Sequence, residues 1–264
     1  MRFLRFWLSL GLVASSAMAV PHGKLLWHDE FSGKAGSKPD AAKWTYDLGG
    51  GGWGNHELET YTDSTKNAFL DGKGHLHIRA EKEADGRFTS ARMKTQGKFS
   101  FTYGRAAVRM KLPRGQGMWP AFWMLGADIE KVPWPGCGEV DVMESLGREP
   151  TTVHGTVHGP GYSGAHGISA KYVLPGAPKL ADKFHVYAVD WRPGSIAFSI
   201  DGHVYATVTP GSLPQGTKWV YDHPFFLLLN LAVGGAWPGN PDATTVFPQE
   251  LVVDWVRVYG VGRR

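Results

Sequence analysis

Apolar and polar residues alternate along much of the chain, and this period of two most constrains how it can fold. In residues 104–112, Ala106, Val108, Met110 and Leu112 share one face of an extended backbone, and the arginines and the lysine do not. An amphipathic helix would instead need apolar residues every three or four positions, and no stretch shows that spacing convincingly. The alternation therefore predicts strands with one face buried.

Residues 195–208 predict a β-hairpin, because Asp201-Gly202 supplies a two-residue turn between two alternating runs. The unbroken apolar run 225–233 predicts a strand covered on both faces. We expect further strands around 76–80, 96–103, 119–125, 138–145, 153–158, 184–191 and 250–259. Many short strands separated by glycine and proline indicate an all-β fold, an antiparallel β-sandwich.

The first 19 residues have a basic start, an apolar run and an Ala17-Met18-Ala19 sequence, which together predict a secretory signal peptide cut after Ala19. The alternative is a short membrane anchor, but the apolar run is shorter than the roughly 20 residues of a bilayer span. We therefore expect residues 20–264 to form one domain, secreted or periplasmic, with no membrane contact after cleavage. The 264 residues, 42% hydrophobic, suffice for one large core.

Charge and cysteine content narrow the function classes further. The formal net charge is +4, and four of the basic residues lie at the chain ends, so no basic face argues for nucleic-acid binding. Cys137 is the one cysteine, which excludes an internal disulfide. Stability must then come from the core or from a bound metal.

Residues 137–147, CGEVDVMESLG, place three carboxylates in a stretch that otherwise reads as a strand. In a regular strand Glu139 and Asp141 share a face, but Glu144 points to the other side. A β-bulge at Val142 and Met143 would return Glu144 to the face of the other two. The motif therefore predicts a bulged strand with three carboxylates on one concave surface.

Such a strand would place the two glutamate carboxyl groups about 5–6 Å apart, the spacing for double displacement at a sugar carbon. Two charges at that distance repel by roughly 3 kcal/mol at an effective dielectric of about 20. One glutamate is then expected to keep its proton as the acid, while the other, next to Asp141, stays ionised to attack. A solvated strand face is the alternative, but Trp119, Trp123 and Trp134 nearby suit the apolar faces of pyranose rings.

The sequence resembles the glycoside hydrolase family 16 β-glucanases, specifically the bacterial laminarinase type. The resemblance covers nearly the whole mature chain and is specific in its Glu-x-Asp-x-x-Glu motif. It rests on LLWHDEFSG, GNHELETYT, SARMKTQGKFSFTYGRAAVRMKLPRGQGMWPAFWML, GCGEVDVMES, HGTVHG, FHVYAVDWRPGSIAFSIDG, LLLNLAVGGAWPG and VVDWVRVYG.

The resemblance implies a β-jelly-roll with an open substrate cleft, a retaining endo-hydrolase and a polysaccharide as partner. It implies that Glu139 is the nucleophile, Glu144 the acid/base and Asp141 the helper between them. Sugar subsites are implied at Asn55, Arg92, Trp119, Trp123, His158 and Trp237, and Trp134 joins them as a tryptophan beside the motif. We expect internal cleavage of β-1,3-glucan, slower cleavage of mixed-linkage glucan, and a monomer.

Three functional alternatives stay open at this stage. The first is the same fold acting on another glycan, such as mixed-linkage glucan (lichenan) or a red-algal galactan, and the second is an enzyme that transfers glycan instead of hydrolysing it. A non-catalytic, lectin-like glucan-binding protein is the third, although such proteins lack the acids that this chain carries. Substitution of Glu139 or Glu144 discriminates the enzyme from the binding protein.

No cofactor is expected for catalysis. His75 and His77, like His154 and His158, suggest zinc only superficially, because no third ligand recurs near either pair. Asp254 interrupts an apolar strand, where a buried carboxylate needs a partner. The family resemblance implies a structural calcium held by Asp254 and by backbone oxygens near Glu30 and Gly74, and a hydrogen-bonded Asp254 is the alternative.

Overall fold

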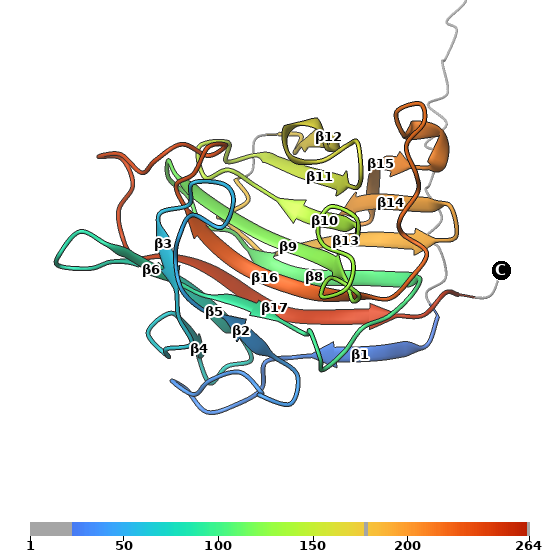
Figure 1. Cartoon of the computed structure of the whole chain (residues 1–264). Coiled ribbons are helices and arrows are strands. Elements are labelled where there is room, and N and C mark those ends of the chain that lie inside the picture. Colours follow the sequence, from blue (N-terminus) through green and yellow to red (C-terminus); the bar gives the residue numbers. More distant parts are fainter. Residues whose placement is uncertain (1–22, 177–178, 263–264) are drawn as a thin grey trace, which may run out of the picture.

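The computed structural model describes residues 23–176 and 179–262, and within them two β-sheets lie one on the other (Figure 1). The predicted antiparallel β-sandwich, of the jelly-roll kind, is confirmed. The expected signal segment 1–19 lies outside the described residues. Two single-turn 3₁₀-helices, η1 (Gly164–His166) and η2 (Pro210–Ser212), accompany the strands, and no described helix could span a bilayer.

The larger sheet contains ten strands, of which only β3 and β6 pair in parallel. β1 pairs with β17 and β4 with β5, off the main path of the sheet. In spatial order the main path runs β15 (His203–Val208), β14 (Ser195–Ile200), β13 (His185–Arg192), β8 (Gly104–Lys111), β17 (Gln249–Tyr259), β5 (Leu76–Lys82), β6 (Phe88–Ser90) and β3 (Glu59–Tyr61), with β1 (Leu25–Asp29) and β4 (Ala68–Leu70) beside it.

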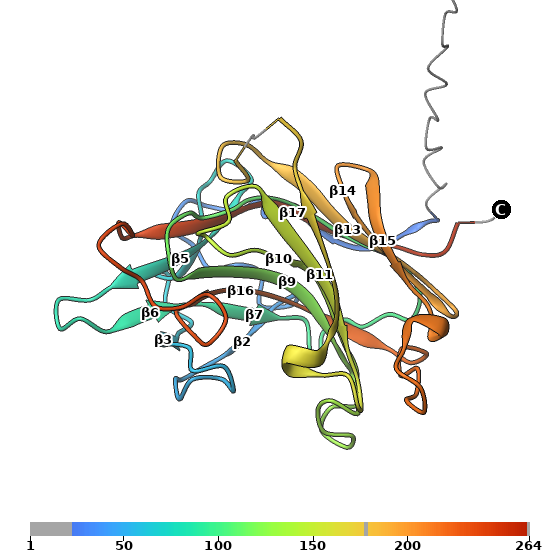
Figure 2. The ribbon, with the colours of Figure 1, turned by 90° about the horizontal axis from the view of Figure 1, so that it is seen from above.

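The smaller sheet contains seven antiparallel strands, and the carboxylate motif lies on the strand next to the central one. Its order is β12 (Ile168–Val173), β11 (Thr152–His158), β10 (Glu139–Glu144), β9 (Met118–Gly126), β16 (Phe225–Val233), β7 (Arg92–Lys94) and β2 (Thr45–Asp47). Figure 2 shows β9, β10 and β11 curving together as they cross the molecule. We call the side of this sheet that faces away from the larger sheet its outer face.

The core lies between the two sheets and explains the alternation in sequence. Ala106, Val108 and Met110 of β8 are fully buried there, as the sequence predicted. β16 is buried along its whole length, because Leu227 and its alternate neighbours enter this core while Phe226 and Leu228 join a second apolar cluster. The prediction of a strand covered on both faces is therefore confirmed.

Most predicted strands are confirmed within a residue or two, including the hairpin β14–β15, in which Asp201 and Gly202 both have positive φ. The strand expected at 96–103 was wrong. Thr95 starts a turn there, because its carbonyl accepts from Phe99 N at 2.8 Å and its Oγ1 donates to the Phe99 carbonyl at 2.9 Å. Only Phe101 forms an isolated bridge with Phe225, so the alternating phenylalanines pack into the core from an irregular segment.

Candidate active site

The bulge predicted in β10 is present and decides which way the carboxylates face. Asp141 pairs with Thr156 of β11 and Glu144 with His154, so two residues of β10 stand opposite one residue of β11. The register on β9 shifts at the same place. Val142 and Met143 both point into the core, which returns Glu144 to the outer face.

Gly155 is the single β11 residue opposite the bulge, and its lack of a side chain is required there. A Cβ at this position would lie 2.6 Å from the Phe198 ring and 2.6 Å from the Tyr205 hydroxyl. Phe198 and Tyr205 therefore pack directly against the β11 backbone at the position opposite the bulge. This close packing holds β11 against the larger sheet at the point where β10 changes register.

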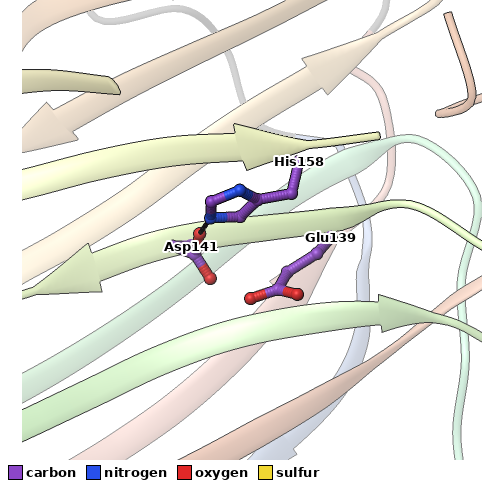
Figure 3. Close-up of side chains that lie close together, drawn as sticks. All are labelled: Glu139, Asp141 and His158. Atoms are coloured by element: carbon purple, nitrogen blue, oxygen red, sulfur yellow. Dashed lines mark ion pairs between the residues drawn. The ribbon is translucent and has the colours of Figure 1, made fainter. Parts of the chain in front are cut away.

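Glu139, Asp141 and His158 lie together on two neighbouring strands (Figure 3). Glu139 and His158 are direct cross-strand partners, and His158 Nε2 lies 3.1 Å from Asp141 Oδ2. Glu139 Oε2 accepts the indole N–H of Trp134, which is 45% exposed. The sequence prediction that Trp134 and His158 join the carboxylates is consistent with these contacts.

Glu144 lies at the other end of the motif, beside Trp119, which is a further predicted residue. Trp119 donates its indole N–H to Glu144 Oε1 at 2.9 Å. The ring of Trp237 meets Trp119 edge-on, with centroids 5.4 Å apart, and also contacts His154. Glu144 is thus held by a hydrogen bond from Trp119, whose ring packs against Trp237.

All three carboxyl groups have raised pKa values, and burial is the largest cause for each. Burial, followed by the Asp141 charge, raises the pKa of Glu139 to about 8. Burial raises the pKa of Glu144 to about 7, although the Trp119 hydrogen bond lowers it. Burial and the Glu144 charge raise the pKa of Asp141 well above its usual range.

Two details of the electrostatic prediction were wrong. Desolvation, not repulsion between the glutamates, is the main cause of the shifts. Burial, followed by the Asp141 charge, raises the pKa of Glu139 too, so the expectation that the glutamate beside Asp141 stays readily ionised does not hold in the free protein. Direct contact between Glu139 and Asp141 requires that one of these two carboxyl groups carry a proton.

Arg92 of β7 and Trp123 of β9 lie on either side of β16, and Trp123 is the cross-strand partner of Asp141. The Arg92 guanidinium is 4.6 Å from the centre of the Trp123 ring and 5.0 Å from that of Trp53. Asp47 Oδ2 lies 2.9 Å from Arg92 Nε and fixes its position. The predicted Arg92 and Trp123 are therefore brought together, and Trp53, which the sequence analysis missed, completes the stack.

Asn55 belongs to a hydrogen-bonded group that sequence reasoning largely missed. Its amide donates to Glu57 Oε1 at 2.9 Å, and Tyr61 donates to Glu57 Oε2 at 3.2 Å. Asn230 donates to Tyr61 and accepts the Trp123 indole N–H at 2.8 Å. An asparagine inside the apolar run 225–233 was the available signal, since a buried amide needs partners.

The predicted calcium residues lie on the larger sheet and in the loops beside it. Asp254 occupies a bulge in β17, where Oδ2 pairs with Arg109 and Oδ1 lies 4.0 Å from His75 Nε2. A Cβ on Gly74 would lie 3.8 Å from the Glu30 carbonyl oxygen, so these two backbones are adjacent. Carboxylate and backbone oxygens suit a calcium ion in kind, but Arg109 already neutralises part of the Asp254 charge.

The histidine pairs have separate partners. His75 Nδ1 lies 2.8 Å from Asp71 and His77 Nδ1 lies 2.7 Å from Glu250, whereas His154 lies 3.3 Å from Glu149. Cys137 is buried and free. In the described part of the chain, His75, His77 and His154 belong to no group of three ligand atoms, but His158 does, with Glu139 and Asp141. The expectation that no further ligand lies near the His154 and His158 pair was therefore wrong for His158.

Comparison with known proteins covers most of the chain. The profile of the glycosyl hydrolases family 16 matches residues 55–257. A beta-glucanase of Rhodothermus marinus is 43% identical over 90% of this chain and 86% of its own length. Glucan endo-1,3-beta-glucosidase A1 of Niallia circulans is 37% identical over 96% of this chain, which spans 40% of that protein. The laminarinase catalytic domain of Thermotoga maritima superposes with a TM-score of 0.86 and 46% identity, covering 92% of this chain and 100% of that domain.

Proposed function

Because the chain belongs to glycosyl hydrolase family 16 and is a glycoside hydrolase, we propose that it cleaves internal β-1,3 linkages of glucan with retention of configuration. The observation that carries this proposal is the β10 bulge, which turns Glu139, Asp141 and Glu144 to one face. A tryptophan N–H holds each of the two glutamates.

In the proposed mechanism, Glu139 attacks the anomeric carbon while Glu144 protonates the departing glycosidic oxygen. A glycosyl ester on Glu139 results, and the leaving chain departs with the Glu144 proton. Glu144 then takes a proton from water, whose oxygen displaces Glu139. Two inversions restore the original β configuration.

Asp141 has a defined part in this mechanism. The reactive form needs Glu139 ionised and Glu144 protonated. When Asp141 carries the proton of the Glu139–Asp141 pair, it donates a hydrogen bond to Glu139 and no longer raises the Glu139 pKa by its charge. His158, 3.1 Å from Asp141, biases where this proton resides.

The substrate proposal rests on the aromatic residues around the carboxylates. Trp119 and Trp237 lie on the Glu144 side, Trp134 lies beside Glu139, and Trp123 stacks on Arg92. Indole faces suit the apolar faces of glucose rings, and the polar groups between them suit hydroxyls. Asn55 and Arg92 supply such groups, so we assign both to sugar subsites.

Two measurements test this function. The first is product analysis on laminarin, curdlan, barley glucan, agarose and κ-carrageenan in parallel, where we expect short laminari-oligosaccharides and slower cleavage of barley glucan. Inert laminarin beside a degraded galactan would refute the substrate. The second is early proton NMR of the new reducing ends, which should be β-anomers; initial α-anomers would exclude double displacement.

We further propose a location, an oligomeric state and a structural metal ion for this protein. Export to a secreted or periplasmic location follows from the features of residues 1–19. We expect the mature chain to act as a monomer. A calcium ion held by Asp254 and by backbone oxygens at Glu30 and Gly74 would stabilise the fold without taking part in the chemistry.

A further inference from the structure

Glu139, Asp141 and His158 form a compact group of metal-ligand atoms. One carboxylate oxygen from each acid and one imidazole nitrogen all lie within 4.8 Å of one another. Within residues 23–176 and 179–262, no other three His, Cys, Asp or Glu side chains meet this condition. Figure 3 shows the three side chains close together, with His158 joined to Asp141 and the Glu139 carboxylate beside that of Asp141.

The orientation of each ligand is fixed by its surroundings. The Trp134 N–H occupies Glu139 Oε2, which leaves Oε1 for another partner. Glycine at position 167 lets the chain pack against the His158 ring, since a Cβ there would lie 2.4 Å from Cε1 and 2.5 Å from Nδ1. Such constraints lower the entropy lost when the three side chains bind one ion.

Asp141 provides an independent sign that a cation belongs here. Its side chain is 3% exposed, and Oδ2 is buried with no hydrogen-bond donor. His158 Nε2 approaches this oxygen to 3.1 Å but without hydrogen-bond geometry. A buried carboxylate oxygen aimed at an imidazole and a second carboxylate is costly unless a positive charge or a proton neutralises it.

We propose that Glu139, Asp141 and His158 bind one divalent transition-metal ion of the zinc type, and that this ion inhibits the enzyme by occupying the nucleophile. An imidazole with two carboxylates suits zinc and its neighbours, whereas calcium and magnesium prefer ligands that are all oxygen. A metal bound to Glu139 Oε1 removes the lone pair that attacks the sugar. Metal and glycan therefore exclude each other.

The test is calorimetric titration of the full chain with zinc chloride in chelator-free buffer. We expect one saturable site, weakened at least tenfold in His158→Gln and in Asp141→Asn. His75→Gln is the matched control, because this histidine also contacts a carboxylate but lies at the larger sheet. It should leave that site unchanged. Circular dichroism and melting curves establish that each variant is folded.

Cobalt(II) supplies a second readout, since its visible absorption reports nitrogen and oxygen ligands directly. We expect the cobalt bands to appear in wild type and in His75→Gln, and to disappear in His158→Gln or on adding excess laminari-oligosaccharide. Zinc should raise the apparent KM for laminarin. The proposal is overturned by the absence of a saturable site, by binding that survives loss of His158, or by metal and oligosaccharide binding together. Calorimetry measures the site whether or not laminarin is the substrate, so failure of the proposed function would be seen separately.

Discussion

Trp119 Nε1 lies 2.9 Å from Glu144 Oε1, so an indole proposed to bind glycan also holds the group proposed as acid/base. The same ring meets Trp237 edge-on. In the proposed mechanism, one side chain thus couples sugar binding to proton transfer. A glycan that shifts Trp119 would also change the electrostatic environment of Glu144.

Trp119→Phe should separate these two roles, because it keeps an aromatic ring and removes the N–H. That hydrogen bond lowers the pKa of Glu144, so its loss should raise this pKa. Glu144 acts in its protonated form, and the alkaline limb of kcat/KM should therefore move to higher pH. We expect kcat to fall about tenfold to a hundredfold, because the acid loses the hydrogen bond that orients it. An unmoved alkaline limb in pH–rate measurements would refute the assignment.

Glu139→Gln and Glu144→Gln should each lower laminarin hydrolysis by several orders of magnitude, because each removes a group that the two-step mechanism requires. Folding and glucan binding should persist, since glutamine preserves the size of the side chain. Steady-state rates and calorimetric binding of laminari-oligosaccharides check the two halves of this expectation. If either variant retained most of the wild-type rate, the role assigned to that glutamate would be wrong.

Asp141→Asn should be less damaging and should shift the acid limb of kcat/KM. The Asp141 charge raises the pKa of Glu139, and asparagine removes that charge. Glu139 would then ionise at lower pH, which moves the acid limb downward. The pH profile distinguishes this from a structural defect, which would lower the rate at every pH without moving the limb.

The calcium proposal predicts that excess chelator lowers the melting temperature and that added calcium restores it, because an ion bound only by the folded state stabilises that state. Asp254→Asn should abolish this response. Activity well below the melting transition should barely change, since Asp254 lies on the larger sheet. An identical melting curve in chelator would leave Asp254 as the ion-pair partner of Arg109 alone.

The sequence was informative where one physical requirement dominated. The odd spacing of Glu144 could be reconciled with a shared face only by an extra residue, and the bulge lies at Val142 and Met143 as predicted. Residues 96–103 misled, because alternating phenylalanines can reach a core from a turn that Thr95 stabilises. The β-strand propensity of these residues does not predict such a hydrogen bond between a side chain and the backbone.

Contacts between distant segments were beyond sequence reasoning. Trp53 on Arg92, and Tyr61 on Asn230, join loops and strands whose proximity depends on the order of strands in the smaller sheet. The raised pKa values of Glu139 and Glu144 likewise depend on burial, and only the packed structure determines burial. The motif indicates which groups react, and the fold determines how they titrate.

Glu59 is a buried acid next to Glu57, the hydrogen-bond partner of Asn55, and it gives the last prediction. It is 1% exposed, its Oε2 accepts the Val233 N–H at 2.6 Å, and it contacts Glu57, the partner of Asn55. Burial, followed by the Glu57 hydrogen bond and charge, raises the pKa of Glu59 to about 9. At neutral pH Glu59 is therefore a protonated acid that can donate to Glu57.

A raised pKa in the folded state has a definite effect on stability. Between the unfolded value of 4.5 and about 9, the folded chain holds a proton on Glu59 that the unfolded chain has lost. The stabilisation from this group is complete below pH 4.5 and is lost as pH rises toward 9, by up to roughly 6 kcal/mol at 1.36 kcal/mol per pKa unit.

Glu59→Gln keeps an N–H donor toward Glu57 and does not titrate, so the stability of this variant should fall less over this range. Urea unfolding of both proteins at pH 5, 7 and 9 measures the difference, in which the shared contributions of Glu139, Asp141 and Glu144 cancel. Parallel losses in the two proteins would mean that Glu59 is not a proton-bearing group in the fold.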